Sequence, residues 1–189
     1  EGVDAVMTNQ AGVCIGVSTA DCIPVLLYDE EHHAVAAIHA GWRGTLARIV
    51  HKTIQEMAFT YHTDPKKLKA VIGPGISLDS FEVGDEVYEA FEQAAFPMEE
   101  IAEQRPNAAF SADPAERERL AAEGNIVQPL KWHLNLPLCN KQILLHCGVA
   151  EENIQDCGIC TFLHSDEYFS ARKLGTESGR IYTAILLEK

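Results

Sequence analysis

The chain has 189 residues, of which 15 are basic and 28 acidic, so its formal net charge is −13 with histidine neutral. Hydrophobic residues make up 47% of the sequence, which excludes a disordered chain and is enough to bury the core of one domain of ordinary size. The shortage of Lys and Arg argues against nucleic acid or an anionic membrane surface as a partner, because both are bound through a basic footprint.

The first half of the chain alternates short apolar runs with polar turns. Runs rich in Val and Ile predict three strands joined by tight turns, at residues 13–17, 23–28 and 34–39. Apolar residues then recur at helical spacing over 46–57, so residues 41–45 link a strand to a helix. A further strand is predicted at 68–72, followed by a helix over 85–94 with Asp85 as its N-cap.

The second half begins with a change of composition. Residues 104–128 are rich in charge, Pro and Asn, which predicts a surface excursion with a short helix over 114–123. The next helix is predicted to begin after the capping residue Asn135 and to end before Gly148. Two last strands are predicted at 154–162 and 181–187.

The order of these elements indicates the fold class. Strands and helices alternate without a strict βαβ rhythm, which favours mixed sheets over a doubly wound parallel sheet. We therefore expect a single α/β (α+β) domain over residues 1–189, with mixed β-sheets covered by helices.

Cys22 and His39 stand at the ends of two predicted strands. If these strands are antiparallel neighbours, the start of one and the end of the next fall at the same edge, so a thiol and an imidazole converge there. Two chemistries fit such a pair: ligation of a metal such as zinc, or a Cys nucleophile with a His base. A buried thiol beside an unrelated surface histidine is the alternative to both.

Arg43 and Gly44 lie at the predicted strand-to-helix junction. Free backbone N–H groups and the helix dipole favour an anion there, and an arginine adds a bidentate grip on phosphate or carboxylate. A solvated surface arginine is the alternative. Arg172 and Arg180 lie in predicted polar loops, where a second anion contact competes with plain surface exposure.

The remaining signals concern the compartment. The six cysteines lie in apolar stretches, which is typical of reduced, buried thiols in a cytosolic protein. Cys157 and Cys160 form a lone CxxC, but residues three apart on a strand point to opposite faces, so we expect structural thiols. No apolar run approaches the roughly 20 residues of a membrane span, and no signal peptide is recognisable. We expect a cytoplasmic protein without a membrane partner.

Several motifs, taken in chain order, resemble those of the YfiH/YlmD family, also named after its vertebrate laccase-domain member and formerly labelled polyphenol oxidase. They are TADCIPV (19–25), HAGWRG (39–44), GPGI (73–76), CT (160–161), FSAR (169–172) and GR (179–180). The resemblance spans essentially the whole chain. It implies a compact fold of mixed sheets and helices similar to the catalytic domain of the cytotoxic necrotizing factors.

The resemblance also implies an activity. The family is identified with zinc-dependent purine nucleoside phosphorylase, acting on adenosine, inosine, guanosine and S-methyl-5'-thioadenosine, with an accompanying adenosine deaminase activity. Its small-molecule partners are purine nucleosides and inorganic phosphate, and nothing in the sequence demands more than a monomer. By motif match, Cys22 and His39 take the places of two zinc ligands. The third is a histidine upstream of the segment that begins at Glu1, so we expect a family domain that lacks its N-terminal part.

Roles for the motif residues follow as hypotheses. Arg43 and the backbone up to Gly44 hold the phosphate, with Arg172 or Arg180 as helpers. Zinc on Cys22 and His39 orients the substrate or supplies a hydroxide for deamination. Asp21 is either a proton carrier, a partner of the neighbouring ligand, or a turn residue without a chemical role.

Three rival functions remain open. In a metal-free hydrolase acting on an amide such as a peptidoglycan precursor, Cys22 is the nucleophile and His39 the base. A copper-dependent polyphenol oxidase is disfavoured, because a multinuclear copper centre needs paired histidines and the eight histidines include no His-x-His pair. The third rival is an acidic binding module without catalysis.

Overall fold

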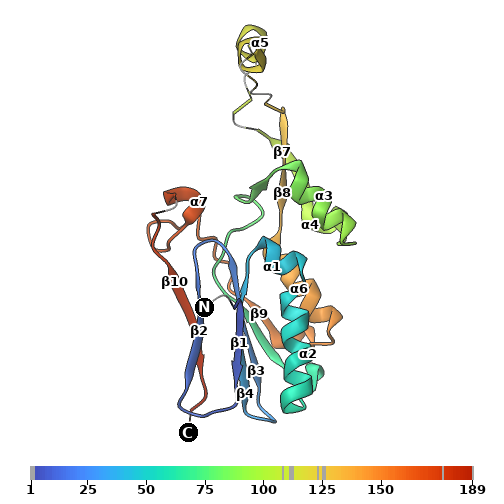
Figure 1. Cartoon of the computed structure of the whole chain (residues 1–189), viewed down its shortest axis with the longest axis vertical. Helices are drawn as coiled ribbons and strands as arrows, with labels where there is room; N and C mark the ends of the chain where they lie inside the picture. Colours follow the sequence, from blue (N-terminus) through green and yellow to red (C-terminus); the bar gives the residue numbers. More distant parts are fainter. Residues whose placement is uncertain are drawn as a thin grey trace.

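The computed structural model describes residues 3–107, 109–110, 113–122, 124, 127–175 and 177–188. Three layers form the body of the molecule (Figure 1). The middle layer is a five-stranded sheet in the order β1 (Ala5–Thr8), β4 (Ala34–Ala40), β3 (Ile23–Asp29), β5 (Lys69–Ile72) and β9 (Ile154–Asp156). A two-stranded sheet packs on one face: β2 (Cys14–Thr19) with β10 (Ile181–Leu186). Three helices cover the other face: α1 (Trp42–Leu46), α2 (Ile49–Tyr61) and α6 (Leu136–His146).

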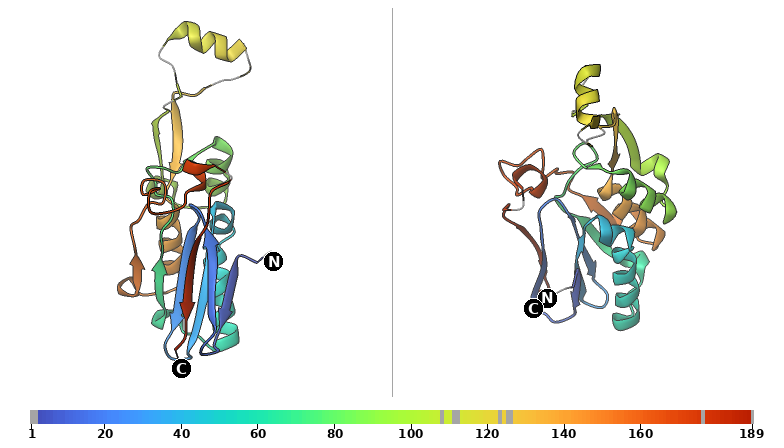
Figure 2. Two further views of the ribbon diagram at one scale, coloured as in Figure 1. Left: turned by 90° about the vertical axis from the view of Figure 1, so that its left-hand side faces the viewer. Right: turned by 45° about the horizontal axis from the view of Figure 1, so that its top comes forward.

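A smaller unit stands above this body. Its three-stranded sheet has the order β6 (Glu82–Val83), β8 (Leu130–Leu134) and β7 (Ala102–Pro106), accompanied by helices α3 (Asp85–Gln93) and α4 (Met98–Ile101). Strands β7 and β8 extend away from the body as an arm with α5 (Pro114–Ala122) at its tip (Figures 1 and 2). The remaining elements are α7 (Ala171–Leu174) and two short 3-10 turns, η1 (Pro65–Lys67) and η2 (Glu151–Asn153).

The core lies on both faces of β3 and β4. In the central five-stranded sheet these two strands are covered by the β2–β10 sheet on one side and by helices on the other, which is why both read as nearly continuous apolar runs. Four alanines in β4 give little bulk and let the layers approach closely. Fully buried residues on these two strands include Ile23, Val25, Leu27, Val35 and Ile38.

Most predicted elements are present, and the mixed α/β class is confirmed. The strands expected at 13–17, 23–28, 34–39, 68–72 and 181–187 correspond to β2, β3, β4, β5 and β10. The helix expected after Asn135 is α6, and the Asn135 side chain accepts a hydrogen bond from Leu138 N at 3.0 Å. The short helix expected over 114–123 is α5, with residue 123 outside the described part of the chain.

Four predictions of detail were wrong. The apolar stretch over 46–57 belongs to two helices, because Arg48 adopts a left-handed backbone (φ 55°) that breaks the helical path. The N-cap of α3 is Gly84, and Asp85 is its first helical residue. The strand expected over 154–162 ends at residue 156, because Gly158 turns the chain with φ 64°. The excursion over 104–128 starts inside β7, whose partner β8 was not predicted.

No helix within the described residues is long and apolar enough to cross a membrane.

Asp29 closes the β3–β4 hairpin through its buried carboxylate. Oδ1 accepts hydrogen bonds from the backbone N–H groups of Glu31 (3.0 Å) and His32 (3.1 Å), and Oδ2 bonds the His32 ring (3.0 Å). Burial alone would raise the pKa of Asp29, but the Thr63 hydroxyl and the His32 N–H groups outweigh it and lower the pKa below its usual 3.8. The hairpin that carries His39 therefore depends on this carboxylate being ionised.

We predict that Asp29→Ala lowers the free energy of unfolding by about 1–3 kcal/mol at pH 7, because two backbone donors lose their acceptor. The contribution of Asp29 is fully present above the pKa of the unfolded chain and is lost as the pH falls through the lower folded-state pKa. Urea unfolding at a series of pH values measures both effects. Glu30→Gln, on the exposed hairpin turn, is the control, and an equal loss in both variants would contradict the role given to Asp29.

Candidate active site

The antiparallel register of β3 and β4 brings Cys22 and His39 together, as the sequence predicted. Ile23 pairs with Ala40 and Pro24 pairs with His39, so the residue before β3 lies beside the end of β4. The Cys22 thiol lies close to the His39 ring, because Cys22 Sγ and His39 Nε2 both lie within 4 Å of the Cβ position on Gly41. Both side chains are partly exposed, so the pair is open to a ligand.

Gly41 keeps the space over this pair open. A Cβ placed on Gly41 would lie 2.9 Å from Cys22 Sγ and 3.8 Å from His39 Nε2. The first distance is shorter than a real Cβ contact, so a side chain at this position would push against the thiol. The glycine of the HAGWRG motif is therefore required by close approach to the reactive pair.

Asp4 completes the group and was not found from the sequence. Its Oδ1 lies 2.9 Å from His39 Nδ1, and its carbonyl accepts a hydrogen bond from His39 N at 2.7 Å. With Nδ1 held by the carboxylate, Nε2 faces Cys22. The same order of carboxylate, imidazole and thiol orients a metal-bound histidine or a catalytic base.

The only signal for Asp4 in the sequence was its position just before a short strand. The pairing of β1 with β4, from Ala5 opposite Ile38, is what places Asp4 beside His39. Neither residue type nor spacing links two residues that are 35 positions apart.

These contacts raise the pKa of His39 to about 9. The hydrogen bond to Cys22 contributes most, burial acts in the opposite direction, and the Asp4 carboxylate adds to the increase. The imidazole is thus held in an environment that favours positive charge, as expected next to groups that carry or develop negative charge.

Asp21 joins three segments beside Cys22. Its carboxylate accepts hydrogen bonds from the Thr161 hydroxyl and the Arg172 backbone N–H, both at 2.7 Å. Its carbonyl accepts one from Ile76 N at 2.8 Å. Asp21 is 9% exposed and has φ 82°, a left-handed conformation that such a tight turn requires. This arrangement fits a positioning role, since both carboxylate oxygens already have partners.

Arg43 is exposed on α1, with its guanidinium carbon 4.2 Å from the centroid of the Trp42 ring. Gly44 lies against β4, because a Cβ there would lie 3.3 Å from the His39 carbonyl oxygen. α1 has five residues, so the dipole available to an anion is smaller than the long helix expected from the sequence would supply. The anion binding expected here therefore depends mainly on the Arg43 side chain.

A buried polar contact anchors α1 from inside the core. The Thr45 hydroxyl donates to the Ala40 carbonyl at 3.4 Å, and Asn140 Nδ2 of α6 donates to Thr45 Oγ1 at 3.1 Å. Thr45 and Asn140 are both fully buried. The turn that carries Arg43 is thereby fixed to α6.

The other two predicted arginines have protein partners. The Arg172 guanidinium donates to the Glu82 carbonyl at 2.9 Å and lies over the Phe81 ring. Arg180 donates to two carbonyls of its own loop, those of Ser178 and Gly179. Arg172 is thus linked to the site through its backbone bond to Asp21, whereas no bond within the described residues joins Arg180 to Cys22, His39 or Arg43.

The two CxxC thiols have different surroundings, and the structural role expected for them fits Cys160 but not the exposed Cys157. Cys157 is exposed, whereas Cys160 is buried and its sulfur meets Ser77 N at 3.4 Å and Ser80 Oγ at 3.6 Å. Both thiols are free.

The side chains of Cys22 and His39 are suitable ligands for the zinc ion that the motif resemblance implies. A thiol and an imidazole nitrogen are ligands that zinc prefers, the histidine is oriented by a carboxylate, and Gly41 leaves space beside both donors. Cys22 and His39 therefore fit two positions of a zinc site. Within the described part of the chain, no group of three or more His, Cys, Asp or Glu side chains gathers as a metal site.

Comparison with known proteins gives a family match over nearly the whole chain. A family model described as "Multi-copper polyphenol oxidoreductase laccase" matches residues 1–188. A protein of Bacteroides thetaiotaomicron named purine nucleoside phosphorylase is 43% identical over 188 residues, which is 100% of this chain and 62% of that protein. A protein of an unknown prokaryotic organism named adenosine deaminase RL5 is 40% identical over 185 residues, or 98% of this chain and 62% of its own length.

Solved structures match as well. The crystal structure of YlmD from Geobacillus stearothermophilus superposes with a TM-score of 0.78 at 26% identity, covering 100% of this chain and 62% of that one. The chain thus spans about three fifths of the length of the relatives that it matches.

We predict that Asp21→Asn lowers the free energy of unfolding by about 1–3 kcal/mol, because an amide cannot accept hydrogen bonds on both of its terminal atoms. Asparagine tolerates the left-handed backbone, so the carboxylate is the group under test. Faster hydrogen exchange at the Arg172 amide would accompany the loss. Asp156→Asn is the control, because that exposed carboxylate accepts a single bond, from Gly158 N. A change no larger than in the control would contradict the role of Asp21.

Proposed function

Because the chain belongs to the YfiH/YlmD family, whose model is described as multi-copper polyphenol oxidoreductase laccase, we propose that it is a purine nucleoside phosphorylase with an accompanying adenosine deaminase activity. Its proposed substrates are inorganic phosphate and the nucleosides adenosine, inosine, guanosine and S-methyl-5'-thioadenosine. The names of two relatives that are 43% and 40% identical support both activities.

The observation that carries the proposal is the Asp4–His39–Cys22 arrangement beneath the bare Cα of Gly41. It places a thiol and an oriented imidazole at an open position of the surface. We propose that Cys22 and His39 hold a zinc ion as two of its ligands. When bound, the ion would lower the pKa of a coordinated water to about 7, the chemistry that deamination requires.

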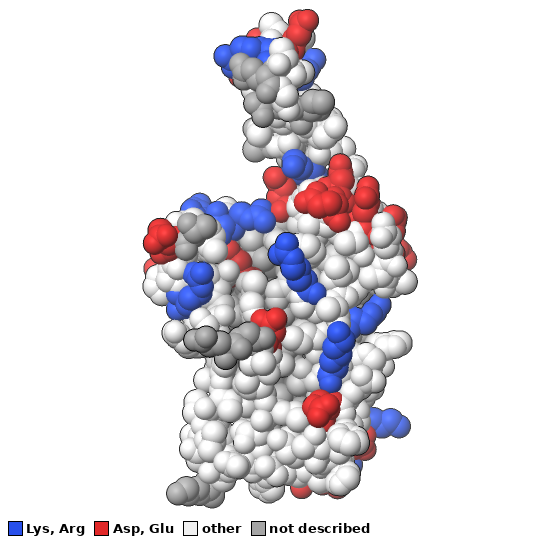
Figure 3. Space-filling view, in the orientation of Figure 1, with Lys and Arg blue, Asp and Glu red and all other residues white. Residues whose placement is uncertain are grey.

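Phosphorolysis needs a phosphate-binding group next to these residues. A phosphate oxygen forms a bond to C1' of the ribose while the bond from C1' to the purine breaks, and the purine leaves with the electron pair and takes up a proton. We assign the phosphate to Arg43, whose guanidinium is exposed on α1 and whose helix is fixed by Thr45 and Asn140. Figure 3 shows basic side chains over α1 and α7, whereas acidic ones gather over α3.

The other predicted site residues take supporting roles in this proposal. Asp21 positions Cys22, because both oxygens of its carboxylate are engaged and neither is free to carry a proton. Arg172 and Gly44 keep the phosphate-binding role expected from their motifs. Arg180 takes the same role when its guanidinium gives up its hydrogen bonds to the Ser178 and Gly179 carbonyls and donates to the phosphate instead. We further propose that residues 1–189 belong to a single domain, that the protein is cytoplasmic and that it is a monomer; the six free cysteines support the cytoplasmic location.

We predict that Cys22→Ala and His39→Ala each abolish phosphate-dependent release of adenine from adenosine. Asp4→Asn lowers the rate by about 10- to 100-fold, because the ring of His39 loses the group that orients it. Release of adenine, followed by chromatography with and without phosphate, measures the effect. Cys14→Ala, at an exposed thiol on β2, is the matched control. Undiminished phosphorolysis in Cys22→Ala would overturn the proposal.

Arg43→Gln tests the binding of phosphate separately from the binding of the nucleoside. We expect the KM for phosphate to rise about 10- to 100-fold, because a charge-assisted hydrogen bond contributes roughly 1.5–3 kcal/mol. The KM for adenosine should change little. Arg119→Gln on α5 removes an equal charge from the arm and serves as control. Equal increases in both KM values would argue that Arg43 does not bind phosphate selectively.

A second candidate is favoured by the same contacts. Carboxylate, imidazole and thiol side by side in this order are also the arrangement of a Cys nucleophile with its base, so a metal-free hydrolase acting on an amide fits Asp4, His39 and Cys22. Elemental analysis separates the two. One equivalent of zinc that is lost in Cys22→Ala supports the phosphorylase, whereas a metal-free protein whose Cys22 is rapidly alkylated by iodoacetamide supports the hydrolase.

A further inference from the structure

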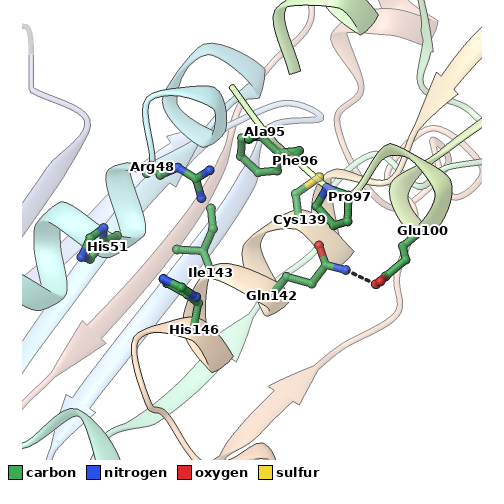
Figure 4. A pocket seen from close by; sticks show the side chains of 10 residues that line it. All are labelled: Arg48, His51, Ala95, Phe96, Pro97, Glu100, Cys139, Gln142, Ile143 and His146. Atoms are coloured by element: carbon green, nitrogen blue, oxygen red, sulfur yellow. Dashed lines mark hydrogen bonds between the residues drawn. The ribbon is translucent and has the colours of Figure 1, made fainter. Parts of the chain in front are cut away.

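A cavity lies in the helical layer and shares no residue with the Cys22–His39 site. It has a volume of about 460 Å³ and is bounded by the start of α2, the turn between α3 and α4, and one face of α6 (Figure 4). Sites for small molecules lie in this range of volume, roughly 300–1,000 Å³. Phe96, Pro97 and Ile143 supply an apolar wall. We refer to it as the α2–α6 cavity.

Arg48 brings a fixed positive charge to this cavity. Its guanidinium donates one hydrogen bond to the Ala94 carbonyl at 3.0 Å and lies over the Phe96 ring, 4.6 Å from the centroid. These contacts hold the side chain in place, and the bond uses one of its five N–H donors. Among the described residues no carboxylate forms an ion pair with Arg48. An anion inside the cavity would therefore find a pre-oriented guanidinium that is not already engaged in an ion pair.

The start of α2 adds to this positive potential. Arg48 is the N-cap of the 13-residue helix but makes no side-chain cap bond, and the first turn contains no acidic residue. The N–H groups of a first turn have no partner within the helix, and the dipole makes that end positive. His51 in the first turn and His146 at the end of α6 line the cavity as well. The cavity is thus rich in donors, in a chain whose net charge is −13.

Glu100 supplies the opposite charge. Its Oε2 accepts a hydrogen bond from Gln142 Nε2 at 2.6 Å, as the dashed line in Figure 4 shows. This bond leaves the carboxylate charged, so an anion in the cavity would lie toward Arg48 and the start of α2. Gln142 Oε1 has no hydrogen-bond partner within the described chain, but the atom has almost no accessible surface, so a ligand does not reach it.

We propose that the α2–α6 cavity binds a phosphate monoester of a sugar or a nucleoside. The phosphoryl oxygens accept from Arg48 and from the first turn of α2, since a phosphate matches both a forked guanidinium and helix N–H groups. The carbon skeleton of the ester packs on Phe96 and Ile143. This second site does not depend on the proposed phosphorolysis, so either can fail without the other.

Titration calorimetry with ribose 5-phosphate, AMP and inorganic phosphate tests the proposal. The protein carries Arg43→Gln, so that phosphate binding at the first site does not contribute heat. We expect one equivalent of at least one ester to bind more tightly than inorganic phosphate. Preference for ribose 5-phosphate identifies a sugar phosphate as the ligand class, and preference for AMP identifies a nucleotide.

Two variants locate the binding. Arg48→Asn keeps a residue that tolerates the left-handed backbone but removes the guanidinium, and should weaken ester binding about 10- to 100-fold. His146→Glu adds a second carboxylate to the cavity lining at an exposed position and should weaken ester binding about 2- to 10-fold by repulsion, which keeps the test decisive if Arg48→Asn fails to fold. Arg119→Asn on α5 should leave binding unchanged. Affinity within twofold of the parent in both cavity variants would overturn the proposal, as would no ester binding below about 10 mM.

Discussion

The position of the reactive thiol depends on the hydrogen bonds of the residue before it. Asp21 fastens the start of β3 to Ile76, Thr161 and Arg172, which come from three segments that are far apart in the sequence. Two of these bonds satisfy groups of the buried residues Ile76 and Thr161, which would otherwise have no partner. These bonds hold Asp21 in a left-handed backbone conformation, which is strained for a residue other than glycine. Surrounding contacts of this kind keep the residue in that conformation. The position of Cys22 is thus set by long-range contacts as much as by its own motif.

The second constraint is the double burial of β3 and β4. Because both faces of these strands are covered, their register cannot slip without moving apolar side chains into the wrong layer. The register fixes His39 beside Cys22, and the edge strand β1 then adds Asp4. An edge strand is more easily lost than an inner one, and β1 is one of the two edge strands of the central sheet, so the carboxylate that orients His39 rests on an edge pairing.

The sequence predicted what local patterns encode. Apolar runs located β2, β3, β4 and β10, an Asn cap located α6, and strand adjacency brought Cys22 and His39 together. Features that depend on distant partners were missed: Asp4 needs the β1–β4 pairing, and the bonds of Arg172 to Asp21 and Glu82 need a folded loop. The break between α1 and α2 was also invisible, because the apolar spacing continues through Arg48 although its backbone does not. β7 and β8 were missed because charge and proline mask a hairpin that is only partly buried.

The tip of the arm formed by β7 and β8 can unfold separately from the rest of the molecule. α5 at its tip contains no buried residue, so its unfolding would expose little apolar surface and leave the three-layer body intact. Segments of this kind tolerate insertions and change length in evolution with little effect on the rest of a fold. The arm is therefore the place where a fluorescent protein or an affinity tag can be inserted into the chain without touching the turn that holds Cys22.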